Sequence, residues 1–275
     1  MLITRIGGPT VLIELHGWRI LVDPTFDDPG RRYAFALGTS SVKTTAPAIS
    51  ASDLGPIDLV LVSHDHHADN LDDAGRALLP AATHVATTAS GARRLGLPQA
   101  HGLTPGDSVI VESPGRQALE ITATPCRHGP PLSHAIVGDV IGFAIRRPGA
   151  VTHDLWVTGD SVLYSGLRKA AEALTVDVAI VNAGGVRFGL TGPIRYTMTG
   201  ADAVRLVTVL EPRVAIPAHF DGWSHFLDGE AGMSAAVRNA PEDVRSRFRW
   251  LPDGESVDLG TPDGDRNEVQ TSPDT

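Results

Sequence analysis

Short apolar runs separated by turn residues define the beginning of the chain. Three such runs, rich in Ile, Val and Leu, occupy residues 2–6, 11–15 and 19–22. Gly7-Gly8-Pro9 and His16-Gly17 separate them, which predicts short strands joined by tight turns. Residues 24–55 show no hydrophobic period, and an irregular connection of this length inside a domain is often functional.

The rest of the chain alternates between strand and helix patterns. A nearly continuous apolar run at residues 57–62 predicts a strand that is covered on both faces. Further strands are predicted at residues 83–86, 107–111, 118–124, 137–146, 154–158, 177–181 and 213–217. Helices are predicted at residues 71–79, 89–95, 161–174 and 199–210. The alternation indicates one layered α/β domain with mixed sheets, which we expect to cover residues 1–262.

The distribution of charge limits the classes of partner. The net charge is −9, and the acidic residues after position 252 account for most of it. Residues 263–275 contain almost no apolar side chains, so we expect them to form a disordered acidic tail. The chain as a whole lacks the basic surplus that nucleic-acid binding requires, and we therefore expect no nucleic-acid partner.

The length of the apolar runs and the number of cysteines indicate the cellular compartment of the protein. No apolar run approaches the length of a membrane span, and the first residues lack the pattern of a signal peptide. The single cysteine, Cys126, cannot form a disulfide within the chain, and we expect it to be a buried thiol. These features predict a cytoplasmic protein without a membrane span, and they are compatible with a homo-oligomer.

Potential metal ligands follow four of the predicted strands. Within Ser63–Asn70, three histidines fall in four residues, and the other groups contain single His or Asp residues: His128, Asp160 and His219. Strand ends in layered α/β folds converge on one edge, where ligands generally bind. His and Asp hold Zn²⁺ while leaving a position open for water. The alternative is a set of unrelated polar residues that cap strand ends.

The order of these motifs resembles the metallo-β-lactamase-fold hydrolases. It is most similar to the branch of the L-ascorbate-6-phosphate lactonases and the phospholipase D that acts on N-acyl phosphatidylethanolamine. The similarity covers roughly residues 1–225 and rests on Leu21-Val22-Asp23-Pro24, the segment Ser63–Asn70, Gly159-Asp160 and Pro217-Ala218-His219. It implies an αββα sandwich.

The resemblance also implies a ligand set. In the family motif His-x-His-x-Asp-His, this chain has one extra residue, His67-Ala68 standing for a single position, and Asn70 replaces the last histidine. A first metal would be held by His64, His66 and His128. A second would be held by Asp69, Asp160 and His219, with Asp160 bridging the two. Either His67 or Asn70 could complete the second site, although the amide of Asn70 is better suited to structural hydrogen bonds.

The implied cofactor is Zn²⁺, two ions per chain, with Mn²⁺ as the alternative. A bound divalent metal lowers the pKa of water to roughly 7, so that hydroxide is available at neutral pH. We expect Asp69, His66 and Asp160 to act in catalysis, with Asp69 orienting or deprotonating the attacking water. The reaction would be hydrolysis of a lactone, ester, amide or phosphoester.

The substrate is expected to be a small soluble molecule, and an anionic group would find arginines in two loops. Arg31, Arg32 and Phe35 lie in the first loop, and Arg187, Phe188, Arg195 and Tyr196 lie in the second. His134 and His225 could also reach the site from adjacent loops. Two alternatives stay open: a metallo-phosphodiesterase or nuclease of the same fold, and a non-catalytic module that binds one metal.

Overall fold

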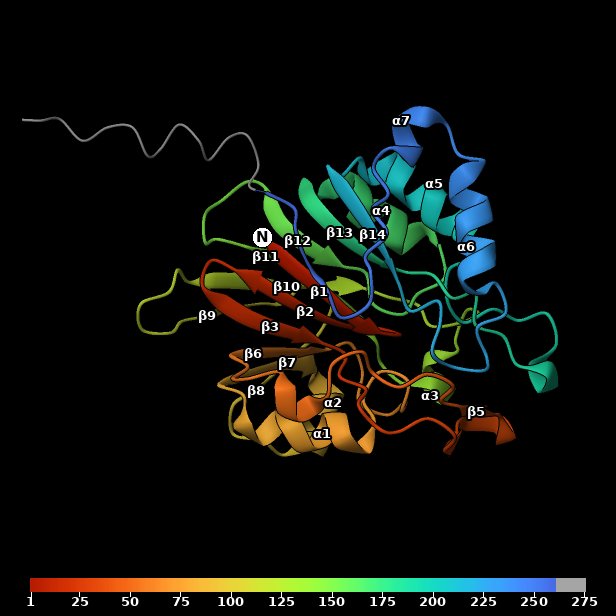
Figure 1. Ribbon diagram of the computed structural model, residues 1–275, viewed down its shortest axis with the longest axis horizontal. Coiled ribbons are helices and arrows are strands. Elements are labelled where there is room, and N and C mark those ends of the chain that lie inside the picture. The colour runs from red at the N-terminus through yellow and green to blue at the C-terminus, as the bar shows by residue number, and fades with distance from the viewer. Residues whose placement is uncertain (261–275) are drawn as a thin grey trace, which may run out of the picture.

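Two β-sheets pack face to face in the computed structural model, which describes residues 1–260 (Figure 1). The first sheet has seven strands in the order β15 (Ser256–Asp258), β1 (Leu2–Gly7), β2 (Thr10–Leu15), β3 (Trp18–Val22), β6 (Leu59–Val62), β7 (His84–Thr88) and β8 (Ala100–Leu103). Strands β15 to β3 are antiparallel, and β3, β6, β7 and β8 are parallel. The parallel half therefore directs the ends of β3 and β6 to the same edge of the sheet.

The second sheet has six strands and the same mixed character. Its order is β14 (Val214–Ala218), β13 (Val176–Asn182), β12 (His153–Val157), β11 (Ile141–Arg146), β10 (Leu119–Pro125) and β9 (Ser108–Val111). The three strands β12, β13 and β14 are parallel, and the others are antiparallel. A separate small hairpin consists of β4 (Arg32–Ala34) and β5 (Ser40–Val42).

Helices cover the outer face of each sheet. Helices α1 (Asp73–Leu78) and α2 (Ala89–Leu95) lie on the first sheet (orange and yellow in Figure 1). The second sheet is covered by α4 (Ser165–Ala173), α5 (Gly200–Leu210), α6 (Gly229–Arg238) and α7 (Glu242–Arg245). The short α3 (His134–Val137) lies in the loop between β10 and β11. The expected αββα sandwich is confirmed.

The alternation of side chains along each strand explains the three apolar layers. Ile20 of β3 faces the space between the sheets, whereas its neighbour Leu21 packs on the outer side. In β13, Ile180 lies between the sheets and Val181 packs against the outer helices. A strand that is buried on both faces needs apolar residues at every position, which is why these runs are continuous in the sequence.

Local sequence signals set several boundaries correctly. Helix α5 begins at the predicted capping box, in which Thr199 accepts a hydrogen bond from the backbone of Asp202 while the Asp202 carboxylate accepts one from the backbone of Thr199. Helix α2 ends at Gly96, which adopts a left-handed conformation with φ of 63°. These caps satisfy backbone groups that the helix ends leave unpaired.

Other boundaries differ from the prediction. The strand expected at residues 137–146 begins at Ile141, because Gly138 has φ of 71° and ends α3 before the strand can start. The helix expected at residues 161–174 begins at Ser165, because Ser161 is buried and bonds to the loop at Arg127. The pattern also missed β8, β15, α6 and α7 and the hairpin of β4 and β5 inside residues 24–55, all of which are short or weakly amphipathic.

The proposed acidic tail, residues 263–275, lies outside the described residues. Among residues 1–260, no helix is long and apolar enough to cross a membrane.

Candidate metal centre

Loops that follow β6, β10, β12 and β14 bring the expected His and Asp side chains together. Each loop begins where its strand ends, and the donors come from both sheets. Three groups of side chains have donor atoms that all lie within 4.8 Å of one another: His64, His66 and His67; His64, His128 and Asp160; and Asp69, Asp160 and His219. Because His64 and Asp160 each belong to two groups, the groups form one continuous cluster.

His67 lies inside this cluster. Its Nδ1 atom is 2.9 Å from Nε2 of His64, and its ring centroid is 5.2 Å from that of His128. His66 instead directs Nε2 to the backbone carbonyl of Val137, and its side chain is 23% exposed. His67 therefore occupies a more central position than His66, which sequence reasoning had placed beside His128.

Asn70 is held by structural hydrogen bonds. Its amide nitrogen lies 3.2 Å from Asp23 Oδ2 and 3.3 Å from Ser63 Oγ, and the residue is completely buried. The amide nitrogen can only donate, whereas Oδ1 is buried without a hydrogen-bond partner in the described chain and could accept a cation. His67 shares a donor group with His64 and His66 and not with Asp69, Asp160 and His219, so completion of the second site by His67 or Asn70 stays a prediction.

Asp23 anchors the first histidine through a serine. Its carboxylate accepts hydrogen bonds from the backbone N–H of Ser63 at 2.6 Å and from the Ser63 hydroxyl at 2.9 Å. Ser63 Oγ lies 3.0 Å from Nδ1 of His64, so the other ring nitrogen of His64 faces the cluster. Burial raises the pKa of Asp23 to about 7, with the charge of Asp160 adding to the effect while the bonds from Ser63 oppose it.

The opposite side of the cluster is an ionic network. Asp160 Oδ1 lies 2.6 Å from Nδ1 of His219 and accepts a hydrogen bond of 2.9 Å from Asn182. Asp69 Oδ2 lies 3.6 Å from Nε2 of His219 and 3.0 Å from Nε2 of His225. Burial alone would lower the pKa of His219, but the adjacent Asp160 and Asp69 carboxylates raise it to about 10.

On the side of the cluster away from Asp160 and His219, burial keeps three histidines in the neutral form: His64, His67 and His128. Burial lowers the pKa of His64 and His128 below the ordinary value, and it lowers the pKa of His67 to about 3. His128 is oriented by a hydrogen bond of 2.9 Å from Nδ1 to the carbonyl of Tyr196. Such a bond fixes the tautomer and leaves Nε2 free to bind a cation. Neutral imidazole is the protonation state that metals require.

The cluster fits a divalent cation. Asp69 Oδ1, Asp160 Oδ2 and Nε2 of His219 are buried and have no hydrogen-bond partner in the described chain. Leaving such atoms unpaired in a protein interior is costly, and a cation would satisfy the carboxylate oxygens directly. The mixture of imidazole nitrogen and carboxylate oxygen suits Zn²⁺, and a carboxylate-rich half also suits Mn²⁺.

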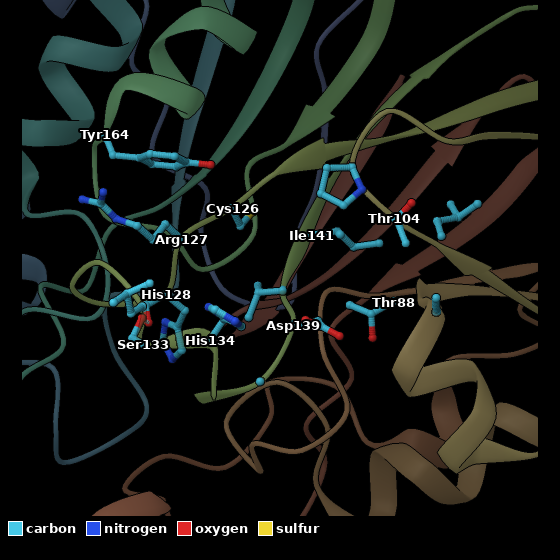
Figure 2. Close-up of a pocket in the computed structure, with 16 residues that line it drawn as sticks. Thr88, Thr104, Cys126, Arg127, His128, Ser133, His134, Asp139, Ile141 and Tyr164 are labelled. Atoms are coloured by element: carbon cyan, nitrogen blue, oxygen red, sulfur yellow. Dashed lines mark hydrogen bonds between the residues drawn. The ribbon is translucent and has the colours of Figure 1, made fainter. Parts of the chain in front are cut away.

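Two hollows border the cluster. A small pocket opens onto His67, Asp69 and His128, and its other walls are mostly apolar. A groove of about 370 Å³ runs along the other side of His128 (Figure 2). Figure 2 shows Arg127 beside the ring of Tyr164, and the guanidinium carbon lies 4.6 Å from the ring centroid.

Some residues expected to bind substrate have other partners. Arg31 pairs with Asp27 and Asp73, and Arg195 pairs with Asp228. His134 lines the groove but belongs to none of the three donor groups. Cys126 is a thiol whose Sγ donates to the carbonyl of Thr158 at 3.0 Å, and burial raises its pKa.

Sequence reasoning gave too little weight to three residues. His225 contacts Asp69 from the loop after β14, and no recognisable sequence motif surrounds it. Asn182 lies at the end of β13 and orients Asp160 through a hydrogen bond. Asp23 was noticed only as part of a motif, although its position immediately before Pro24 and after a buried strand could have indicated an anchoring role. Each acts through contacts between segments distant in sequence.

Two mixed sheets packed face to face, with His and Asp donors gathered where their strands end, define the metallo-β-lactamase class of metal-dependent hydrolases. A family model described as a beta-lactamase superfamily domain matches residues 18–220, and the chain belongs to this family. The protein named UPF0173 metal-dependent hydrolase from Caldivirga maquilingensis is 25% identical over 248 residues, which cover 88% of this chain and 86% of that protein.

Solved structures share the fold. A possible metal-dependent hydrolase from Veillonella parvula has a TM-score of 0.75 at 19% identity, covering 94% of this chain and 98% of that one. An isothiocyanate hydrolase from Delia radicum gut bacteria has a TM-score of 0.74 at 20% identity, covering 95% of this chain and all of the other. Together, the family match and the curated relatives make the chain a metal-dependent hydrolase of the superfamily.

Proposed function

We propose that the protein hydrolyses an ester or lactone bond of a small organic molecule with the aid of two divalent ions, preferably Zn²⁺. The observation that carries this proposal is the continuous cluster of buried donors linked through His64 and Asp160, with unpaired oxygens on Asp69 and Asp160. Lactones are included because of the motif resemblance to L-ascorbate-6-phosphate lactonases. A cytoplasmic location belongs to the same proposal.

Each residue has a role in this scheme. His64, His67 and His128 would hold one ion, and Asp69 and His219 would hold the other, with Asp160 between them. When bound, the ions would lower the pKa of a water molecule towards neutrality and polarise the oxygen of the substrate. Asp69 Oδ1, which has no hydrogen-bond partner among residues 1–260, would orient the attacking water. His66 lies at the exposed edge of the cluster, where it would contact the substrate or the leaving group.

The experiment combines metal analysis with hydrolysis assays. The purified full chain is expected to hold more than one equivalent of metal and to hydrolyse members of an ester and lactone panel. Chelation should abolish hydrolysis, and Zn²⁺ or Mn²⁺ should restore it. Asp69→Asn should lower kcat by at least 100-fold, whereas Asp73→Asn, an exposed carboxylate on α1, should leave it unchanged. A single tightly bound ion without hydrolysis of any panel member would overturn the proposal and favour a non-catalytic metal-binding module.

A second candidate function is hydrolysis of a small phosphodiester, and Arg127 favours it. No carboxylate pairs with Arg127 within residues 1–260, and its Nε is buried without a hydrogen-bond partner. An unpaired guanidinium beside His128 could bind a phosphate oxygen. Activity on bis(p-nitrophenyl) phosphate that falls at least tenfold in Arg127→Met, with esters and lactones untouched, would establish this alternative.

A further inference from the structure

A layer of aromatic side chains lies directly on the imidazoles of the cluster. The ring of Phe35 contacts His67 and His225 edge-on, with centroid distances of 5.3 and 5.7 Å. Phe35 lies between the two strands of the small hairpin, β4 and β5, in the long connection that follows Asp23. This connection therefore places the apolar ring of Phe35 against two imidazoles of the metal centre, those of His67 and His225.

A second segment completes this layer. The ring of Phe188 lies 5.3 Å from His225 and 5.9 Å from Phe35, and the ring of Tyr196 lies 5.9 Å from His128. Both residues belong to the loop between β13 and α5. Phe188 and Tyr196 also contact each other at 5.7 Å. Two loops far apart in the sequence therefore meet above the metal centre through aromatic contacts.

These rings form the walls of the small pocket that opens onto the cluster. The rest of its apolar lining comes from Ala36, Leu37, Ile136, Val137 and Val186, and among residues 1–260 the only carboxylate that lines it is Asp69. No arginine or lysine of the described chain lines this pocket. An anionic group placed here would find no arginine or lysine with which to pair, whereas an apolar group would be covered on several sides.

The pocket is narrow. Its free volume is about 20 Å³, which is enough for one water molecule. Phe35 and Phe188 are each partly exposed, so rotation of these two rings can widen the pocket without disturbing the buried core. Closure of the rings over a bound molecule would then exclude water from its apolar part.

We infer that the substrate carries an uncharged apolar group, of the size of a short acyl chain or a phenyl ring, next to the bond that is cleaved. Phe35, Phe188 and Tyr196 determine this specificity by enclosing that group. The inference rests on the proposed function, since it concerns the same centre. It differs from a role in which the rings merely hold the histidines in place, because that role would not distinguish between substrates.

Binding of hydroxamates to the zinc-loaded protein tests the inference without requiring turnover. Acetohydroxamate, butyrohydroxamate and benzohydroxamate share one metal-binding group and differ only in the apolar part, and the hydroxamate of succinate adds a carboxylate at similar length. Each buried methylene is expected to tighten binding about fourfold, so butyrohydroxamate should bind at least tenfold more tightly than acetohydroxamate. The carboxylate compound should bind more weakly than butyrohydroxamate.

Variants separate specificity from structure. Phe188→Ala should remove most of the difference between butyrohydroxamate and acetohydroxamate, and Phe188→Leu should keep part of it. Leu190→Ala is the matched control, because Leu190 lies two residues away, is 77% exposed and does not line the pocket. With esters, the same Phe188 variants should change KM for butyrate esters more than kcat.

The outcomes are distinguishable. Equal affinities for the three neutral hydroxamates, tighter binding of the carboxylate compound, or an unchanged preference in Phe188→Ala would each overturn the inference while the metal-bound protein still supports the proposed function. A chain that takes up no zinc would overturn both. Metal content is therefore measured for every variant before binding is compared.

Discussion

Asp23 accepts two hydrogen bonds from Ser63, one from the backbone N–H at 2.6 Å and one from the hydroxyl at 2.9 Å. The same hydroxyl lies 3.0 Å from Nδ1 of His64, so the Asp23 carboxylate orients this histidine indirectly, through Ser63. Residues in such positions beside metal ligands contribute strongly to metal affinity, because they fix the tautomer and direction of the ring.

Replacement of Asp23 should therefore weaken metal binding. We expect Asp23→Ala to lower the affinity for zinc by 10- to 100-fold, measured by competition with a chromogenic chelator. The control is Asp58→Asn, because Asp58 is a buried carboxylate that bonds to Arg19 and Arg116 away from the cluster. If both variants lost affinity equally, the effect would have to be attributed to general destabilisation.

His67 and Asn70 should differ in their importance for metal binding. His67→Ala should lower zinc affinity by at least tenfold, because it removes a donor 2.9 Å from His64. Asn70→Ala should instead lower the free energy of unfolding of the metal-free protein by about 1–3 kcal/mol, since it leaves buried partners unsatisfied. Calorimetric titration and chemical denaturation measure the two effects. The reverse ranking would make Asn70 the metal-binding residue.

Gly138 controls the position of His66. A Cβ atom at this residue would overlap the ring of His66, and the φ of 71° at Gly138 is unfavourable for any other residue. We expect Gly138→Ala to displace His66 and to reduce hydrolysis at least tenfold. Gly149→Ala is the control, because Gly149 has φ of 80° but open space around it. Similar activity in the two variants would show that the contact with His66 does not matter.

A cross-strand ion pair should make a small, pH-dependent contribution to stability. Glu120 and Arg146 lie opposite each other in β10 and β11, and two hydrogen bonds of 3.0 Å join them. The Arg146 hydrogen bond lowers the pKa of Glu120, so the stabilisation is present above the ordinary pKa of about 4.3 and is lost as the pH falls.

Denaturation with urea at two pH values can measure this contribution. Glu120→Gln should lower the free energy of unfolding by about 0.5–1 kcal/mol at pH 7, and the deficit should shrink towards pH 3. Glu172→Gln removes an exposed carboxylate for which the described residues provide no ion-pair partner, and it should have no effect at either pH. A deficit that is independent of pH would assign the effect to packing.

The hydrophobic pattern predicted a layered α/β domain with mixed sheets, because its strands are buried on both faces and its helices have one apolar face, and the family resemblance added the αββα sandwich. The candidate site could be predicted to the extent that its residues follow strand ends, as His128, Asp160 and His219 do. The central position of His67 could not be predicted, since it depends on how one extra residue bends the loop after β6. His225 was expected only as a residue that could reach the site, and its contact with Asp69 could not be predicted, because only the folded loop after β14 brings the two together.

The donors of the centre come from both sheets, with His64 and Asp69 following β6 of the first and His219 following β14 of the second. The distances between the donor atoms therefore depend on the spacing between the sheets, which is set by side chains such as Phe143. A change of volume in that interior can leave the fold intact and still separate the donors. Selection on activity thus constrains the size of core residues that never touch a substrate.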